Sequence, residues 1–264
     1  MSKKIAVIGH KGYVGRAFAE FAAKRYELVC YDIAEGVDYP KVEIDACALA
    51  AVCVPTPPAA DGSCDTFIVE DAISKIDCPL ILIKSTVAPG TTERLRRETG
   101  KRIVFSPEYI GESKYYNPVY KNMSETNFLI CGGEAADVTE VFTLLEPIAG
   151  PYSTYHACTS TEAEIIKYMV NSFLATKVAF VNEFYDIAQA YGADWHRVRE
   201  GWLLDERIGR SFSAVFAEDR GFGGKCLPKD TQAIVKAAAD AGYESSIVKA
   251  VVAYNRRLRG DMDN

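Results

Sequence analysis

The chain has 264 residues, of which 48% are hydrophobic, and its formal net charge is −6. This composition supports one large domain or two smaller ones. The net charge is acidic and Lys and Arg are spread along the chain, so we expect no nucleic acid partner. No apolar run approaches the roughly 18–20 residues of a membrane span, and the opening MSKKIAVIG has no signal-peptide architecture. We therefore expect no membrane association.

The cysteines indicate the redox compartment. Eight are scattered along the chain without a CxxC pair. Those in or beside apolar segments are Cys30, Cys47, Cys53, Cys78 and Cys131. This usage predicts reduced thiols in a cytoplasmic protein, with neither a disulfide framework nor a metal site.

The first predicted element is a buried strand at residues 3–9, KKIAVIG, followed by a glycine turn and a helical pattern. Gly9, Gly12 and Gly15 form a GxxGxxG pattern, one residue longer than the usual GxGxxG. Small residues let a pyrophosphate approach the backbone, and the helix N-terminus supplies amide groups. Asp32 ends the next strand, 17 residues after Gly15, where a carboxylate would bind the ribose of NAD and repel the 2′-phosphate of NADP. An ordinary strand–turn–helix unit is the alternative.

Strands and helices continue to alternate up to about residue 157. The further strand segments are residues 47–57, 79–83, 101–109, 126–133 and 151–157, and helical patterns follow near 91–98 and 136–150. This alternation predicts an N-terminal doubly wound parallel (Rossmann) sheet over residues 1–157. Polar clusters at 55–57, 85–86 and 106–108 follow strands, where such sheets bind ligands, although turn chemistry alone also explains each of them.

A long helix is predicted from about residue 159 to 191, because this segment contains no proline and no glycine before Gly192. Its length of about 45 Å is too great for one helix inside a compact sheet domain. We therefore expect an interdomain helix that leads into a mostly α-helical dimerisation domain, residues 158–264.

Two polar residues lie on what should be a buried face of this helix. Lys167 and Asn171 stand four residues apart, and the same face continues with Leu174 and Val178. A buried ammonium needs a partner, so this pair predicts a ligand-facing position. The alternative is that Lys167 reaches solvent or pairs with Glu164.

A cysteine follows a flexible loop in GFGGKCLPKD, residues 221–230. Lys225 and Lys229 flank Cys226, and nearby cations favour the thiolate. The segment therefore predicts a nucleophile.

These segments, in this order, resemble the UDP-glucose/GDP-mannose dehydrogenase family from about residue 5 to 255. The matching stretches are GYVG, VCVPTPPAADGSCD, STVAPGTTERL, SPEYIGES, AEIIKYMVNSFLATKVAFVNE, DERIG and GFGGKCLPKD. The resemblance implies NAD as cofactor and oxidation of the C6 primary alcohol of a nucleotide sugar, of UDP-glucose type, to a carboxylate. It also implies a homodimer built around the long helix.

The resemblance assigns a role to each matching residue. Cys226 would form a thiohemiacetal and then a thioester, Lys167 would stabilise the oxyanion, and Asp230 would work with a bound water. The full catalytic set is Cys226, Lys167, Asn171, Asp230, Thr86 and Glu108. Expected cofactor contacts are Gly9, Gly12, Tyr13, Val14, Gly15, Asp32, Thr56, Thr86 and Glu112. Expected substrate contacts are Lys167, Asn171, Phe222, Gly223 and Arg207, the last reaching the neighbouring subunit's substrate.

The chain departs from the family pattern at several positions. Lys225 replaces a usual serine, Leu227 a usual phenylalanine, and Gly111 a common arginine. The chain ends at Asn264, where family members continue into a further domain that binds the nucleotide half of the substrate. A separate chain supplying that domain, the same chemistry on a smaller sugar or other hydroxylated substrate, and a non-catalytic NAD-binding remnant therefore remain alternatives.

Overall fold

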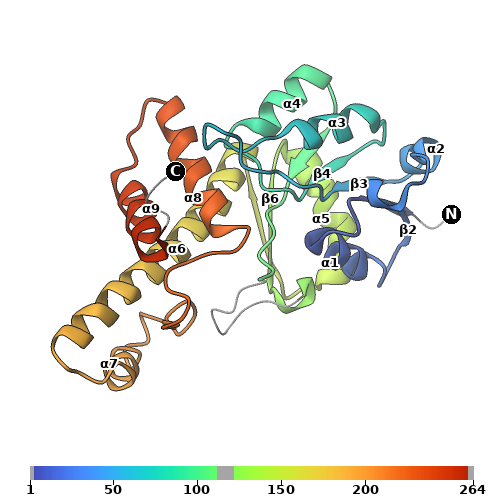
Figure 1. Ribbon diagram of the computed structural model, residues 1–264. Coiled ribbons are helices and arrows are strands. Elements are labelled where there is room, and N and C mark those ends of the chain that lie inside the picture. The colour runs from blue at the N-terminus through green and yellow to red at the C-terminus, as the bar shows by residue number, and fades with distance from the viewer. Residues whose placement is uncertain (1–2, 112–121, 261–264) are drawn as a thin grey trace. The chain divides into compact units, whose positions relative to one another are not determined.

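The computed structural model describes residues 3–111 and 122–260 of the chain (Figure 1). They divide into two compact units. Unit 1 comprises residues 3–59, 64–110 and 122–167, and unit 2 comprises residues 60–63, 111 and 168–260. The units meet in sequence inside helix α6 (Ser160–Ala190), and the domain boundary expected at residue 157 stays a prediction.

Unit 1 is built on a seven-stranded sheet of order β2-β1-β3-β4-β5-β6-β7. The strands are β1 (Lys4–Ile8), β2 (Glu27–Tyr31), β3 (Leu49–Val52), β4 (Ile81–Ile83), β5 (Ile103–Phe105), β6 (Phe128–Gly132) and β7 (Thr154–Cys158). All pairs are parallel except β5 with β6, which pair antiparallel at Phe105 and Gly132. The Rossmann sheet predicted from the sequence is therefore confirmed, with one antiparallel junction that the alternation of strands and helices does not predict.

Helices cover both faces of this sheet, as Figure 1 shows. They are α1 (Tyr13–Ala22), α2 (Lys41–Asp45), α3 (Phe67–Lys75), α4 (Thr91–Thr99) and α5 (Ala135–Ala149), with short 3₁₀ turns η1 (Ile33–Glu35) and η2 (Met123–Glu125). Ile5 and Val7 pack with residues of α1 and α5, whereas Ala6 and Ile8 pack with residues of α3 and α4. Successive strand side chains point to opposite faces, so a strand covered on both sides is apolar throughout.

The long helix α6 begins and ends where the sequence predicts. Thr159 Oγ1 accepts a hydrogen bond from Glu162 N at 3.3 Å, and Glu162 Oε2 accepts one from Thr159 N at 2.7 Å. This reciprocal pair is a capping box. After the helix, Gly192 has a φ of 65°, a left-handed conformation that glycine adopts without strain.

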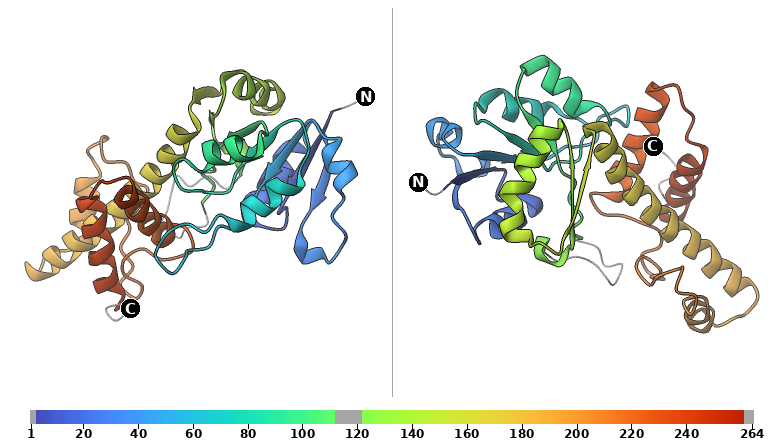
Figure 2. Two further views of the ribbon diagram at one scale, coloured as in Figure 1. Left: turned by 90° about the horizontal axis from the view of Figure 1, so that it is seen from above. Right: turned by 180° about the vertical axis from the view of Figure 1, so that it is seen from behind.

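Unit 2 is mostly helical, as expected, with α7 (Trp195–Trp202), α8 (Leu227–Asp240) and α9 (Ser246–Arg259) following α6 (Figure 2). A core cluster joins Val178 of α6, Leu227 of α8 and Val251 of α9. Within the mostly α-helical domain expected over residues 158–264, residues 203–226 form turns and loops. None of the helices in the described ranges is long and apolar enough to cross a membrane.

Candidate functional site

The glycine turn of unit 1 is packed against backbone. A Cβ on Gly9, whose φ is 84°, would lie 2.6 Å from the carbonyl oxygen of Cys53, and a Cβ on Gly15 would lie 2.1 Å from that of Gly9. Gly12 caps α1 without a side-chain hydrogen bond. A helix start that no capping side chain covers can receive an anion at its amide groups. The turn thus has the backbone shape that a pyrophosphate needs.

Asp32 lies beside this turn at the end of β2. Its Oδ2 accepts a hydrogen bond from Lys11 N at 3.0 Å, and its Oδ1 accepts one from Ala34 N at 3.0 Å. Each carboxylate oxygen has two lone-pair sites, so both can accept further bonds from ribose hydroxyls. The glycine turn, the start of α1 at Tyr13 and Val14, and this carboxylate together fit NAD.

A buried ion pair occupies the ends of two neighbouring strands. Lys84 follows β4 and Glu108 follows β5, and Lys84 Nζ lies 3.3 Å from Glu108 Oε2 with both side chains at most 7% exposed. Glu108 Oε1 also accepts from the backbone N–H of Tyr109 at 2.8 Å. Removing either partner would leave a buried charge uncompensated. Glu108 was predicted from the sequence and Lys84 was not, although a lysine directly after the apolar run PLILI is a usable signal.

Lys167 contacts the same segment. Its ammonium donates a hydrogen bond to the carbonyl oxygen of Glu108, and its Nζ lies 5.2 Å from the ring centroid of Tyr109. Glu164 has other partners, because its two carboxylate oxygens accept from Gly90 N at 2.6 Å and Thr92 N at 2.8 Å. The pairing of Lys167 with Glu164, considered from the sequence, is therefore not the arrangement found. Burial raises the pKa of Glu164 to about 7.

The remaining expected residues of unit 1 give less information. Thr56 is buried, and Thr86 is partly buried with its backbone carbonyl accepting a hydrogen bond from the Cys64 thiol at 3.4 Å. Glu112 lies outside the described residues. Their roles stay predictions.

In unit 2 the structure brings Asn171 and Asp230 together. Asn171 Nδ2 of α6 donates to Asp230 Oδ2 of α8 at 2.5 Å, and the two side chains belong to residues 6% and 1% exposed. Lys229 Nζ lies 2.6 Å from the other oxygen, Asp230 Oδ1. A buried carboxylate is thus supported by an amide and an ammonium, as burial of a charge requires.

Cys226 is exposed at the start of α8. Its carbonyl oxygen accepts a hydrogen bond from Asp230 N at 2.8 Å, so the thiol lies one helical turn before the buried acid. Leu227, the next residue, is buried in the core of unit 2. An exposed cysteine at the start of a helix whose first turn carries a fixed acid is compatible with covalent catalysis.

The expected substrate contacts of unit 2 differ in exposure. Phe222 is buried, and a Cβ on Gly223 would lie 3.1 Å from the guanidinium carbon of Arg259. Arg207 is exposed, and its Nε donates to Asp205 Oδ1 at 2.9 Å. A direct contact of the Phe222 side chain with a substrate would require it to leave the core.

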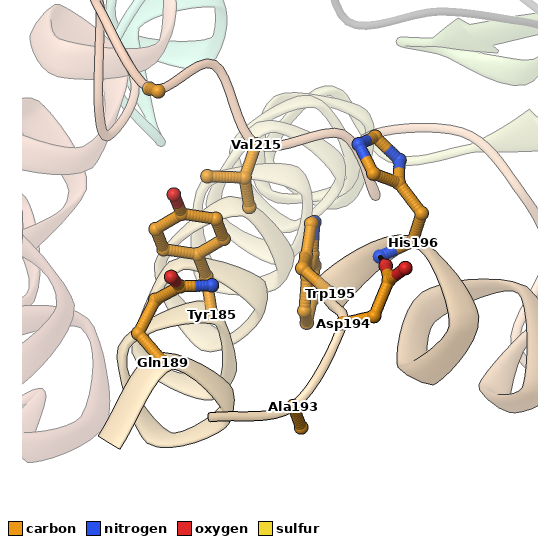
Figure 3. A pocket seen from close by; sticks show the side chains of 8 residues that line it. Tyr185, Gln189, Ala193, Asp194, Trp195, His196 and Val215 are labelled. Atoms are coloured by element: carbon orange, nitrogen blue, oxygen red, sulfur yellow. Dashed lines mark hydrogen bonds between the residues drawn. The ribbon is translucent and has the colours of Figure 1, made fainter. Parts of the chain in front are cut away.

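A separate pocket of about 390 Å³ lies at the far end of α6 (Figure 3). Figure 3 shows Tyr185 and Gln189 on one side and Trp195 and His196 on the other. Its lining includes none of the expected site residues and no cysteine. Residues 3–111 and 122–260 contain no cluster of three His, Cys, Asp or Glu side chains that could hold a metal. The residues expected from the sequence therefore lie outside this pocket, in unit 1 at the ends of the strands and in unit 2 around Cys226.

These features define a class of protein with a dinucleotide-binding Rossmann unit and a helical unit that carries a thiol. Residues 36–145 match the family model of the UDP-glucose/GDP-mannose dehydrogenase family, NAD binding domain, and residues 161–257 match that of the same family's central domain. The chain belongs to the UDP-glucose/GDP-mannose dehydrogenase family.

Individual relatives agree with this assignment. The chain is 32% identical to UDP-glucose 6-dehydrogenase TuaD of Bacillus subtilis, over 97% of this chain and 64% of the relative. It is 34% identical to UDP-glucose 6-dehydrogenase AglM of Haloferax volcanii, over 83% of this chain and 54% of the relative. A UDP-glucose dehydrogenase structure from Pyrobaculum islandicum aligns with a TM-score of 0.83 at 28% identity, over 97% of this chain and 68% of that chain. The chain thus spans little more than half the length of several curated relatives.

Proposed function

We propose that this chain catalyses the NAD-dependent oxidation of the primary alcohol of a nucleotide sugar, of UDP-glucose type, to a carboxylate. Family membership supports the reaction class. The observation that carries the proposal is the exposed thiol of Cys226, one turn before an Asp230 carboxylate that is buried and hydrogen-bonded to Asn171.

The proposed chemistry keeps the substrate carbon on the protein between two oxidations. NAD, when bound, takes up hydride, and two molecules account for the four electrons between alcohol and carboxylate. Cys226 Sγ adds to the aldehyde carbon, and the aldehyde oxygen becomes the hydroxyl of a thiohemiacetal. Oxidation of that adduct gives a thioester, and water then releases the carboxylate and restores the thiol.

The other residues would act on charge and protons. Lys167 would stabilise the oxyanion that forms when the thiol adds to the aldehyde, with Asn171 hydrogen-bonding the same region. Asp230 would accept a proton through a bound water. Thr86 and Glu108 would orient the water that hydrolyses the thioester, and the buried Lys84 would hold the Glu108 carboxyl group in place through their ion pair.

The binding roles are proposed on the same basis. Backbone groups of the glycine turn and the Asp32 carboxylate would hold NAD, and the backbone near Phe222 and Gly223 would contact the sugar. The cofactor set comprises Gly9, Gly12, Tyr13, Val14, Gly15, Asp32, Thr56, Thr86 and Glu112.

We also propose that the protein is a homodimer through α6. One side of this helix exposes large apolar side chains at helical spacing. They are Met169, Phe173, Phe180, Phe184 and Ile187, followed by Tyr191 directly after the helix, with 43% to 86% of each residue exposed. A second copy of the same face would cover them and bring its Arg207 toward the partner's substrate. Sedimentation should show a dimer that Phe173→Glu converts to a monomer.

We infer a cytoplasmic location from the cysteines. All eight lie within the described residues and none forms a disulfide. Thiols in this state fit a reducing compartment.

The proposed reaction is tested by counting NADH per sugar. With UDP-glucose or another nucleotide sugar we expect two NADH for each carboxylate formed.

The cysteine variants test the covalent step. Cys226→Ser should bind NAD with unchanged affinity and form no carboxylate, whereas Cys30→Ser, which also changes an exposed cysteine, should behave like the unchanged protein. Activity only on sugars without a nucleotide would favour the smaller substrate, and NAD binding without any turnover would favour a non-catalytic protein. Carboxylate formation at the normal rate by Cys226→Ser would refute the covalent mechanism.

A further inference from the structure

The loop that carries Cys226 is rich in glycine, so its backbone alone does not restrict it to one conformation. It begins with Gly221, Phe222, Gly223 and Gly224, and φ is 72° at Gly221 and 79° at Gly224. Glycine loses more conformational freedom on ordering than any other residue. A single position for the Cys226 thiol therefore requires support from outside the loop.

Asn255 of α9 supplies that support with one side chain. Its Oδ1 accepts a hydrogen bond from Phe222 N at 2.7 Å, and its Nδ2 donates to Phe222 O at 2.9 Å. One buried amide thus pairs with both backbone groups of one residue, as a neighbouring strand would. A Cβ on Gly221 would lie 2.4 Å from Asn255 Oδ1, so glycine at this position makes room for the amide.

The two hydrogen bonds fix Phe222. The packing of buried side chains on either side of Cys226 extends this support toward the thiol. The Phe222 side chain is buried in the same cluster as Val178 and as Leu227, the residue after Cys226. Cys226 is therefore exposed between two buried anchors. Displacing Phe222 would move the chain that leads to the sulfur.

A second amide supports the loop less directly. Asn182 Oδ1 accepts from Arg220 Nε at 2.6 Å and from Gly221 N at the longer distance of 3.3 Å. Asn182 thus mainly holds the arginine before the loop, whereas Asn255 holds the loop itself.

We propose that Asn255 is a positioning residue that fixes Cys226 for attack on the substrate aldehyde. This inference rests on the proposed function and adds to it a residue that does not touch the substrate. A primary amide supplies both the donor and the acceptor that Phe222 requires. Leucine at position 255 would supply neither, and aspartate would set a carboxylate oxygen against the Phe222 carbonyl.

The test compares Asn255→Leu and Asn255→Asp with Val181→Ala. Val181 is a buried residue of α6 that packs with Ala188 and Trp195, in a different cluster from Phe222 and Leu227, so its truncation loosens unit 2 without removing their packing. The measurements are the carboxylate yield, the aldehyde trapped by hydroxylamine, and the rate of Cys226 alkylation by iodoacetamide. The rate in Cys226→Ser is subtracted as the background from the other cysteines.

We expect both Asn255 variants to form carboxylate about 10- to 100-fold more slowly, because small displacements of a reacting group cost this much. Trapped aldehyde should rise relative to carboxylate, the KM for NAD should stay unchanged, and the alkylation rate of Cys226 should shift. Val181→Ala should change aldehyde and carboxylate together, keep their ratio and leave alkylation unaltered.

A folded Asn255→Leu protein with the normal product ratio and the normal alkylation rate would overturn the proposal. If that variant does not fold, Asn255→Asp decides, because it keeps the side-chain volume and the acceptor. Failure of both to fold, with Val181→Ala folded, would reassign Asn255 to a purely structural role. If the unchanged protein forms no carboxylate, the proposed function fails, and the alkylation rates still decide whether Asn255 positions the thiol.

Discussion

Two glycine-rich segments of this protein look alike in sequence and are built in opposite ways. In unit 1 the space beside Gly9 and Gly15 is filled by main-chain carbonyl groups. In unit 2 the space beside Gly221 and Gly223 is filled by side chains, those of Asn255 and Arg259. Backbone at the carboxyl ends of the packed strands cannot move aside, whereas a side chain can adopt another rotamer. Glycines of the first kind should therefore tolerate substitution less well than those of the second.

A similar contrast separates two of the buried carboxylates. Glu164 in unit 1 accepts hydrogen bonds from the backbone N–H groups of Gly90 and Thr92. Asp230 in unit 2 is held by the side chains of Asn171 and Lys229. Main-chain groups thus hold Glu164, whereas Asp230 is held by side chains that substitution can replace one at a time.

The largest effect is expected for Gly15→Ala. The new Cβ would lie 2.1 Å from the carbonyl oxygen of Gly9, and neither backbone segment can yield. We expect the free energy of unfolding to fall by about 3 kcal/mol or more, measured by urea denaturation. Gly12→Ala is the matched control, because its Cβ would lie 3.3 Å from the same oxygen and its φ of −66° suits alanine. Equal losses in the two variants would contradict the comparison.

Glu164 should make unit 1 less stable as the pH rises. Burial raises its pKa from 4.5 to about 7, so the folded state binds its proton more tightly than the unfolded chain does. The resulting stabilisation is complete below pH 4.5 and is lost as the pH rises through about 7, a change of roughly 3 kcal/mol at most. Urea midpoints from pH 4 to 9 should show this slope as a difference from Glu164→Gln. A constant difference across that range would refute it.

Gly221→Ala should have an intermediate effect. It places alanine at a φ of 72° and sets its Cβ 2.4 Å from Asn255 Oδ1, which can move only by breaking its bond to Phe222. We expect a loss of about 1–3 kcal/mol. Gly209→Ala separates the strain of a positive φ from the contact with Asn255, because Gly209 has a φ of 67° and no atom within 4 Å of its Cβ position. A loss no greater than that of Gly209→Ala would show that the Asn255 contact adds no strain.

The smallest effect is expected for Gly223→Ala. Its Cβ would lie 3.1 to 3.2 Å from the guanidinium group of Arg259, the far end of a flexible side chain. The guanidinium can shift, so the loss in unfolding free energy should stay below about 1 kcal/mol. Arg259→Ala combined with Gly223→Ala should then show nearly additive losses in a double-mutant cycle. A loss as large as that of Gly15→Ala would show that the loop before Cys226 is as rigid as the glycine turn after β1.

Much of the fold was predictable because it depends on local patterns. The apolar runs at residues 3–9 and 79–83 contain the strands β1 and β4, and the helix expected from about 159 to 191 is α6. The antiparallel junction between β5 and β6 was not predictable in this way. An alternation of strands and helices sets strand direction only where a helix returns the chain, and the described residues between these strands contain only η2.

The functional residues were harder to predict from the sequence than the helices and strands were. Cys226 could be selected because a glycine loop and two lysines surround it in sequence. Lys84 and Asn255 were missed because their roles depend on partners that are distant in sequence. Lys84 has meaning only through Glu108 on the neighbouring strand, and Asn255 only through the backbone of Phe222.

The sequence by itself determined the order of strands and helices, the glycine turn before α1, and the presence of a cysteine after a flexible loop. These features follow from the spacing of residues that are neighbours in the chain. Only the tertiary structure decided which partners the polar groups have. Asn171 pairs with Asp230 and Lys167 with the Glu108 carbonyl across 59 residues of sequence in each case. Periodicity carries no information over such separations, because buried polar groups pair with whatever the packed chain places beside them.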